Sequence, residues 1–178
     1  MGRGMILRAA SWDATESRIR RVPQYAACRS LRECEFPPAR LMPLCKTVRT
    51  YRLRRVEELV AGYRHGSIAL FRSVLLESDR GGPVLIPPPI IERHASSFVV
   101  VDGLHRVYLA RALGERAIVV ALAQGGLEPL PGAILAWEQI EVRNRHTRRS
   151  AKFLNFEERH FRDIPRVLDH DTPGSGPR

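Results

Sequence analysis

A histidine and an arginine stand together in residues 99–114, VVVDGLHRVYLARALG, where the pattern indicates the first turn of a helix. The segment opens with three β-branched residues, and apolar residues recur at helical spacing after Asp102. Cations are disfavoured in a first turn because the N-terminal end of the helix dipole is positive. We therefore expect an anion to bind at this position, and phosphate is the usual occupant of a helix N-terminus.

The residues of this turn divide into binding and catalytic candidates. Backbone N–H groups in a first turn lack partners within the helix, and a glycine lets a ligand approach the main chain closely. The His-Arg pair would add side-chain donors, the arginine through two parallel hydrogen bonds. Aspartate is a preferred N-cap that would shape the turn or help to hold a metal ion. The phosphate-binding candidates are Gly103, Leu104, His105 and Arg106, and the catalytic candidates are Asp102, His105 and Arg106. The alternative is a plain helix start that exposes two basic side chains to water.

A second basic segment lies near the C-terminus. Such a cluster could follow a nucleic-acid backbone, with each neutralised phosphate making binding more sensitive to salt. The alternative is a solvated basic helix or linker, which is common for runs of like charge. The nucleic-acid candidates are Arg143, Arg145, Arg148, Arg149 and Lys152.

Composition limits the possible classes of protein. The chain has 178 residues, of which 44% are hydrophobic, so it is long enough for one domain with a core. Its formal net charge of +10 comes mainly from arginine and favours anionic partners such as nucleotides or DNA. No apolar run has the ~18 residues of a membrane span, and the start lacks the core of a signal peptide. We therefore expect no membrane contact and a cytoplasmic location. The spacing of Cys28, Cys34 and Cys45 fits no zinc pattern, so we expect reduced thiols and no metal site in the protein itself.

The elements that must position the candidate site are a strand at 98–101, a helix at 102–113 and a strand at 117–123. This order is compatible with a parallel crossover or with a mixed sheet. A further amphipathic helix is expected from Leu53 to a stop at Gly66. We expect the chain to divide into an irregular N-terminal arm with one short helix (1–40), a core opening with a strand at 40–48 (41–125), and a basic, helical C-terminal extension (126–178) with helices near 132–144 and 156–170.

Residues 53–123 resemble the ParB/sulfiredoxin superfamily. The segment VVVDGLHRVYLARALGERAIVVAL is similar to the strand, (D)G-x-[HR]-R, helix, LG, strand core of that superfamily, and the helix VEELVAGYRHG precedes it as in the family. The resemblance implies an α/β (α+β) fold with a small mixed sheet. It also implies binding of nucleotide phosphates through Gly103, His105 and Arg106, with CTP in ParB proteins, ATP in sulfiredoxin, and ATP or ADP in free serine kinases. The implied cofactors are therefore ATP or CTP with Mg²⁺.

The departures from the family pattern narrow the chemistry. Sulfiredoxin has its nucleophilic cysteine where this chain has Leu104, so reduction of a sulfinic acid is not expected. DGLHR is closest to the DGHHR of the serine kinases, but the loop CKTVRTYRLRR lacks their catalytic glutamate. Glu57, Glu58 or Asp102 could replace that general base, although both glutamates are expected on the solvated face of their helix.

Three functions remain open from the sequence. The first is an ATP-dependent phosphotransferase acting on a small hydroxylated substrate, or a nucleotide hydrolase. The second is a ParB-like DNA-binding, partition or regulatory protein that uses the basic C-terminal segment, although residues 126–178 show no helix-turn-helix pattern. The third is a family member that keeps the fold for protein contacts alone.

Overall fold

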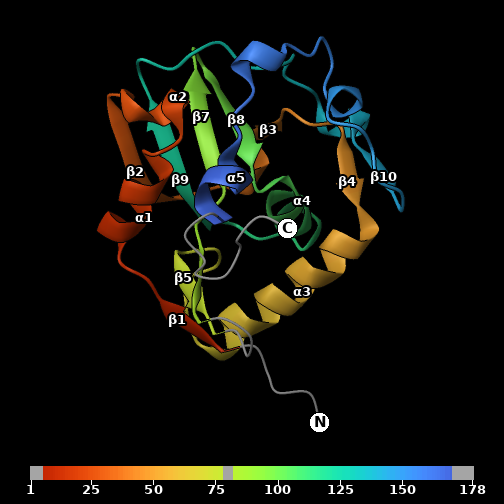
Figure 1. The fold of residues 1–178 in the computed structure, drawn as a ribbon. Helices are drawn as coiled ribbons and strands as arrows, with labels where there is room; N and C mark the ends of the chain where they lie inside the picture. The colour runs from red at the N-terminus through yellow and green to blue at the C-terminus, as the bar shows by residue number, and fades with distance from the viewer. Residues whose placement is uncertain (1–5, 78–81, 170–178) are drawn as a thin grey trace, which may run out of the picture.

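The computed structural model describes residues 6–77 and 82–169, and its centre is a mixed five-stranded sheet in the order β2-β9-β7-β8-β3 (Figure 1). In this sheet β7 is antiparallel to β8 and parallel to β9. The class is therefore α+β. The strands are β2 (Ser30–Phe36), β3 (Leu41–Pro43), β7 (Ile90–His94), β8 (Ser97–Asp102) and β9 (Ile118–Gln124).

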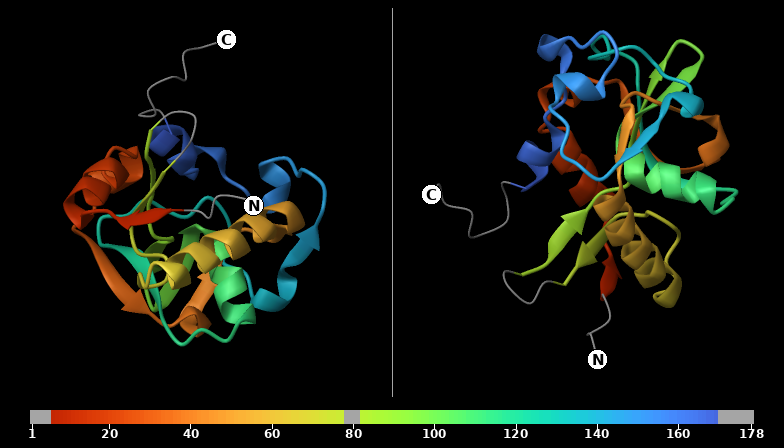
Figure 2. Two further views of the ribbon diagram at one scale, coloured as in Figure 1. Left: turned by 90° about the horizontal axis from the view of Figure 1, so that it is seen from below. Right: turned by 90° about the vertical axis from the view of Figure 1, so that its right-hand side faces the viewer.

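Helices cover both faces of this sheet. Successive side chains of a strand point to opposite sides, and the central strands are apolar on both sides, so each face needs a covering layer. Ile90 and Ala121 belong to one apolar cluster, which includes residues of the first two helices and of α5, whereas their neighbours Ile91 and Leu122 belong to the cluster under α3 and α4. The right-hand view of Figure 2 shows these layers. The helices are α1 (Trp12–Ile19), α2 (Pro23–Ala26), α3 (Thr50–His65), α4 (Leu104–Ala112) and α5 (Ile164–Asp169).

Two smaller sheets flank the central one. The first is antiparallel and has the order β1-β5-β6, and the second is a parallel pair of β4 and β10. Four 3-10 turns complete the described residues. These elements are β1 (Leu7–Ala9), β4 (Thr47–Arg49), β5 (Val74–Leu76), β6 (Val84–Ile86), β10 (Glu141–Arg143), η1 (Pro38–Arg40), η2 (Trp137–Gln139), η3 (Ser150–Lys152) and η4 (Glu158–His160).

The predicted strand, helix and strand around the motif are confirmed as β8, α4 and β9, and the predicted stop at Gly66 is the C-cap of α3. The connection is not a parallel crossover, because β7 lies between β8 and β9 and these two run in opposite directions. The predicted N-cap is also wrong. Asp102 is the last residue of β8, and the N-cap is Gly103 in a left-handed conformation with a φ of 84° and no side-chain cap.

The prediction of an irregular arm at 1–40 is wrong for the residues that the structure describes. Ile19, Val22 and Tyr25 are fully buried, and β2 pairs with β9 over its whole length. The side chain of Ser11 accepts a hydrogen bond at the start of α1. Charged residues within the strand SLRECEF hide it from a search for apolar runs, since it lies at a sheet edge with one solvated face.

The C-terminal region is less helical than predicted. The expected helix at 132–144 is a loop with one 3-10 turn followed by β10, held by a hydrogen bond of 2.7 Å from the Trp137 indole N–H to the Leu41 carbonyl. The expected helix at 156–170 is reduced to η4 and α5, and residues 170–178 lie outside the described residues. The expected strand at 40–48 is divided into β3 and β4. Within the described residues, no helix is long and apolar enough to cross a membrane.

Candidate anion-binding site

A cavity of about 830 Å³ opens at the carboxyl end of β8, where the predicted motif lies. Its walls come from β4, α3, the start of α4, the β5–β6 hairpin, η3 and the chain entering α5. Cationic side chains outnumber carboxylates along these walls. The charged lining residues are Arg49, Arg52, Arg55, Arg106, Arg149, Lys152 and Arg162, with Glu58, Asp102 and Asp163 as the carboxylates.

Three of these cations, Arg49, Arg52 and Lys152, form what we call the cationic cluster. Arg49 lies on β4, where Thr47 and Arg49 face the cavity and Val48 between them faces the core. Arg49 is only 6% exposed, and within the described residues its guanidinium pairs with no carboxylate, only stacking on Tyr51 at 5.4 Å. Burial and the charge of Arg49 both lower the pKa of Lys152. Arg49 is buried, Lys152 is half-buried and Arg52 is exposed, and among the described residues none of the three is paired with a carboxylate. Their like charges repel one another, so the cluster favours an anion.

Two helix N-termini meet at this cluster. Arg49 is the N-cap of α3, and Gly103 is the N-cap of α4. Neither helix has a side-chain cap or an acidic residue in its first turn. Each such end leaves backbone N–H donors unsatisfied and adds a positive partial charge. The two ends together raise the positive potential of the cavity beyond that of its side chains.

A buried hydroxyl without a partner also faces the cavity. Thr47 is 4% exposed and lines the cavity, and its Oγ1 has no hydrogen-bond partner among the described residues. A buried polar group without a partner costs about 1–3 kcal/mol, which a bound group would recover. The hydroxyl therefore marks a second point at which a ligand atom fits.

His105 does not have the charge that we expected. Its Nε2 accepts a hydrogen bond of 3.0 Å from the backbone N–H of Arg49. Burial, followed by the charges of Arg52 and Arg49, lowers the pKa of His105 to about 4. The imidazole is therefore neutral near pH 7 and has its proton on Nδ1. It contributes a neutral donor to the cavity in place of a positive charge.

Arg106 is directed into the protein, which differs from the expected fork on a phosphate. It is 9% exposed, its Nη1 donates to the Pro87 carbonyl, and its Nη2 lies 3.4 Å from Asp102 Oδ2. The backbone N–H of Arg106 donates to the Gly103 carbonyl at 2.9 Å, so it is not free for a ligand as expected. Arg106 thus positions the turn, and within the described residues the N–H groups of Leu104 and His105 have no backbone acceptor.

Gly103 is needed at this turn for packing as well as for conformation. A Cβ at this position would lie 2.9 Å from the Cβ of Pro89 and 2.9 Å from Nη2 of Arg106. Its positive φ also disfavours any other L-residue. We predicted that the missing side chain of Gly103 would let a ligand approach the main chain. In the structure, Pro89 and the side chain of Arg106 occupy that space.

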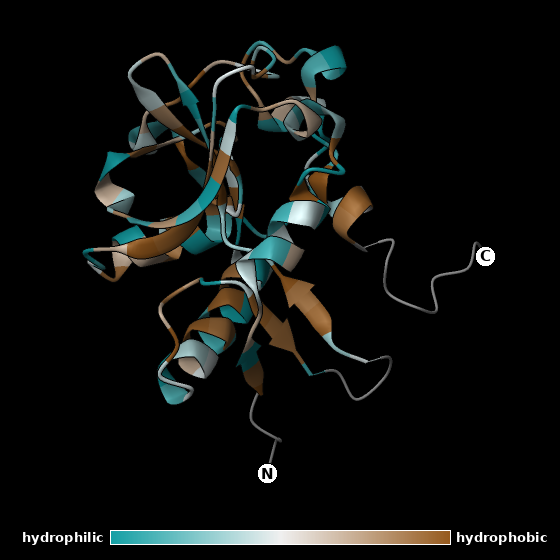
Figure 3. Ribbon diagram, turned by 90° about the vertical axis from the view of Figure 1, so that its left-hand side faces the viewer, coloured by the Kyte–Doolittle hydropathy of each residue, from teal (hydrophilic) through white to brown (hydrophobic). Residues whose placement is uncertain are grey.

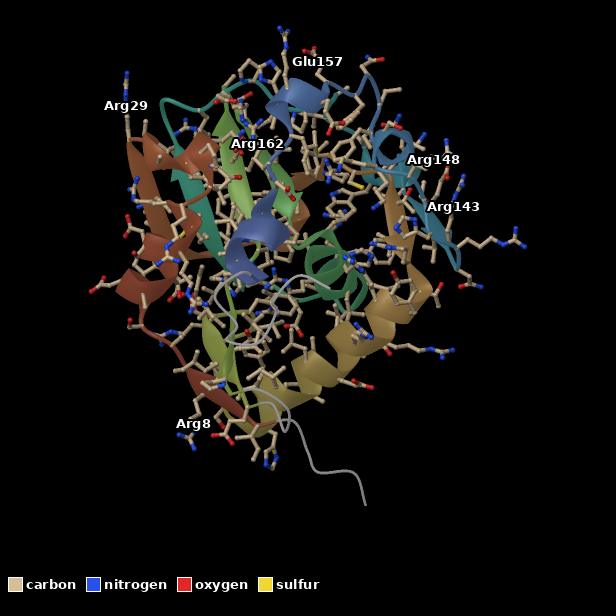
Figure 4. The ribbon with its side chains drawn as sticks, viewed as in Figure 1. Arg8, Arg29, Arg143, Arg148, Glu157 and Arg162 are labelled. Atoms are coloured by element: carbon tan, nitrogen blue, oxygen red, sulfur yellow. The ribbon has the colours of Figure 1, made fainter. Side chains whose placement is uncertain are left out.

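The basic C-terminal segment is divided between the cavity and the surface. Arg149 and Lys152 line the cavity, and the backbone N–H of Lys46 donates to the Lys152 carbonyl at 2.8 Å. Arg149 is ion-paired with Glu158 at 2.9 Å and stacks on Phe161. The remaining candidates, Arg143, Arg145 and Arg148, are exposed on β10 and the following loop and do not belong to the cavity lining. Figure 4 labels Arg143 and Arg148.

Sequence reasoning missed Thr47, Arg49 and Arg52 as site residues, whereas it named Glu58 as a possible general base. The sequence signal for the three missed residues was the segment from Lys46 to Arg55, which contains five basic residues and no acidic residue. This segment includes the start of α3 at Thr50. We expected Glu58 on a solvated face; it is exposed, but it also lines the cavity.

Metal ligation, the cysteines and comparisons with known proteins do not narrow the function further. Within the described residues, no group of three His, Cys, Asp or Glu side chains could hold a metal ion. The three cysteines are free thiols, of which Cys45 lines the cavity, and burial raises the pKa of each. Comparisons with protein-family models, curated proteins and solved structures found no match for this chain.

Proposed function

We propose that this protein binds the phosphates of a nucleoside triphosphate, ATP or CTP with Mg²⁺, in the cationic cavity. The observation that supports it best is Arg49, which is only 6% exposed and lines the cavity, and whose guanidinium has no carboxylate partner among the described residues. Arginine is suited to phosphate because its planar fork donates two parallel hydrogen bonds. The resemblance to the ParB/sulfiredoxin superfamily points in the same direction and stays a prediction.

Each part of the ligand has a matching part of the cavity. Arg49, Arg52 and Lys152 would bind phosphate oxygens, and the orphaned Thr47 hydroxyl would donate to one of them. The N–H groups of Leu104 and His105 would add the donors of a helix N-terminus. Phe153 and Phe161 also line the cavity, and a base would lie beside this aromatic group, in which Phe153 stacks on Phe156 and Arg149 covers one face of Phe161.

The carboxylates fit the metal that accompanies a nucleotide. Asp102 and Glu58 supply oxygen ligands of the kind that Mg²⁺ prefers, and Mg²⁺ would neutralise charge on the phosphates. One of the two carboxylates would also accept the proton of an attacking hydroxyl or water. The reaction would be phosphoryl transfer to a small hydroxylated substrate or hydrolysis of the nucleotide.

A second candidate function follows from the exposed part of the basic segment. Arg143, Arg145 and Arg148 are exposed, and within the described residues only Arg143 is paired, with Glu141. Such side chains suit a DNA backbone. In that case duplex binding would fall steeply with salt and would be lost when all three are changed to glutamine.

The test is isothermal titration of ATP, ADP and CTP, each with Mg²⁺, at low salt. Wild type and the control Arg143→Met should bind at least one triphosphate with micromolar affinity, and Arg49→Met should bind it at least about tenfold more weakly. Absence of binding to wild type, or equal affinity in all three proteins, would contradict nucleotide binding at this site. Salt-sensitive duplex binding without nucleotide binding would favour the second function.

A further inference from the structure

The lining of the cavity also includes a group of aliphatic side chains, which we call the aliphatic end, in contrast to the cationic cluster at the cationic end. Leu76, Ile86 and Val101 belong to it and are half-buried, and the buried Leu59 and Ile164 complete it. Figure 3 shows hydrophobic colouring on the β5–β6 hairpin and on α5. Grouped aliphatic side chains in a concave wall favour an apolar ligand group, because burial rewards the removal of apolar surface from water.

The cationic and aliphatic ends follow one another along α3. Arg52, Val56 and Leu59 line the cavity at spacings of four and three residues, so they lie on one face of the helix. At 1.5 Å per residue, the Cα atoms of Arg52 and Leu59 lie roughly 10 Å apart along the helix axis. A single small molecule can therefore touch both ends.

Two carboxylates of the cavity stand next to aliphatic lining residues in the chain. On α3, Glu58 precedes Leu59, and at the end of β8, Asp102 follows Val101. Both carboxylates line the same cavity as the cationic cluster, so a proton acceptor is available in the cavity that holds the aliphatic side chains.

From this arrangement we infer that the hydroxylated substrate of the site is a soluble aliphatic alcohol, an inference that rests on the proposed nucleotide binding. Its hydrocarbon part lies against the aliphatic end, and its hydroxyl lies within reach of Glu58 or Asp102. The hydroxyl oxygen bonds to the terminal phosphorus of the nucleotide, and the bond from that phosphorus to the bridging oxygen breaks. The hydroxyl proton goes to Glu58 or Asp102, and the products are an alkyl phosphate and a nucleoside diphosphate.

The product class supplies the probe, because an alkyl phosphate spans both ends without any reaction. Affinities of ethyl, butyl and hexyl phosphate are measured by calorimetry, with inorganic pyrophosphate as the probe of the cationic end. We expect affinity to rise about fourfold for each methylene that becomes buried. Val101→Thr, which keeps the side-chain shape, should flatten this rise while leaving pyrophosphate affinity unchanged. The matched control is Val142→Thr, which is 51% exposed and outside the cavity lining.

The outcomes separate this inference from the function on which it rests. If pyrophosphate does not bind to wild type, the phosphate site itself is wrong. If pyrophosphate binds but all alkyl phosphates bind equally well, or if Val101→Thr and Val142→Thr behave alike, the aliphatic substrate is wrong. Vesicles containing phosphatidic acid provide a last probe, and strong binding to them would show that the hydrocarbon comes from a membrane lipid in place of a soluble alcohol.

Discussion

Two buried arginines of this molecule, Arg162 and Arg49, are surrounded in opposite ways. The side chain of Arg162 is 0% exposed, and its five N–H donors all have acceptors in the protein. Arg49 is almost as deeply buried at 6% exposed, but among the described residues its guanidinium has no hydrogen-bond acceptor and stacks on the ring of Tyr51. Burial alone therefore does not assign a role to an arginine, whereas the presence or absence of acceptors for its N–H groups does.

Arg162 belongs to a buried ion-pair and hydrogen-bond network that stabilises the fold. Its Nε and Nη2 donate to the two oxygens of Glu92 at 2.9 Å, and Glu92 also accepts one hydrogen bond from the Tyr25 hydroxyl and contacts His94. Burial acts to raise the pKa of Glu92, but the hydrogen bonds from His94 and Arg162 outweigh it and keep the pKa below its usual value. This network joins the N-terminal helices, the central sheet and the C-terminal segment.

Removing the ion pair between Arg162 and Glu92 should have the greatest effect on the free energy of unfolding. Arg162→Met should lower the free energy of unfolding by about 3–5 kcal/mol, because it leaves the carboxylate of Glu92 buried without its cationic partner. Arg49→Met should not lower it, because no carboxylate is abandoned. Urea unfolding of both variants beside wild type provides the comparison. A similar loss in both would mean that Arg49 has a structural partner after all.

The second prediction concerns the pH dependence of stability that His105 causes. The pKa of this group is lowered from 6.5 to about 4 in the folded protein, so the unfolded chain takes up a proton first on acidification. The stability that neutral His105 provides is thus present above pH 6.5 and is lost as the pH falls toward 4, with a magnitude on the order of 3 kcal/mol. In His105→Gln the amide oxygen can still accept from Arg49, and this variant should lose less stability over the same range.

A bound anion should reverse part of that shift. The charges of Arg52 and Arg49 contribute to the low pKa of His105, and a phosphate beside them would offset their effect. Titration of the His105 ring proton by NMR, with and without saturating pyrophosphate, should therefore show a higher pKa in the complex. An unchanged pKa would place the anion away from His105.

The smallest effect is expected at the exposed arginines. Changing Arg143 and Arg145 to glutamine should alter the free energy of unfolding by no more than about 0.5 kcal/mol, because surface charges are well solvated. Pyrophosphate affinity should change less than twofold, since neither residue lines the cavity. A large loss of affinity would move the anion site onto β10.

The central part of the fold was predictable because its signals are local. A continuous β-branched run, a helical period and a terminating glycine identify β8, α4 and the end of α3 within short windows. The N-terminal region was missed because its partners are distant in sequence. Tyr25 is held by Glu92, 67 residues later, and no pattern within residues 1–40 announces that contact.

The candidate site was predicted in place but not in its details. The Asp-Gly-Leu-His-Arg segment does lie at the cavity, because a strand end followed by a helix start is readable from sequence. The role of Arg106 depends on the Pro87 carbonyl, and that of Arg49 depends on pairing between β4 and β10, two strands of three residues each. Neither contact leaves a sequence signal, so the surroundings of these two arginines emerged only from the structure.

The most direct test of this account is the stabilisation of the protein by inorganic pyrophosphate. At a ligand concentration one hundred times its dissociation constant, wild type should gain about 2.7 kcal/mol in free energy of unfolding. The double variant Arg49→Met and Lys152→Met should gain almost nothing at that concentration, while its own stability in the absence of ligand is not reduced. An equal gain in both proteins, or no gain in wild type at low salt, would contradict the claim that the cationic cluster is built to bind phosphate.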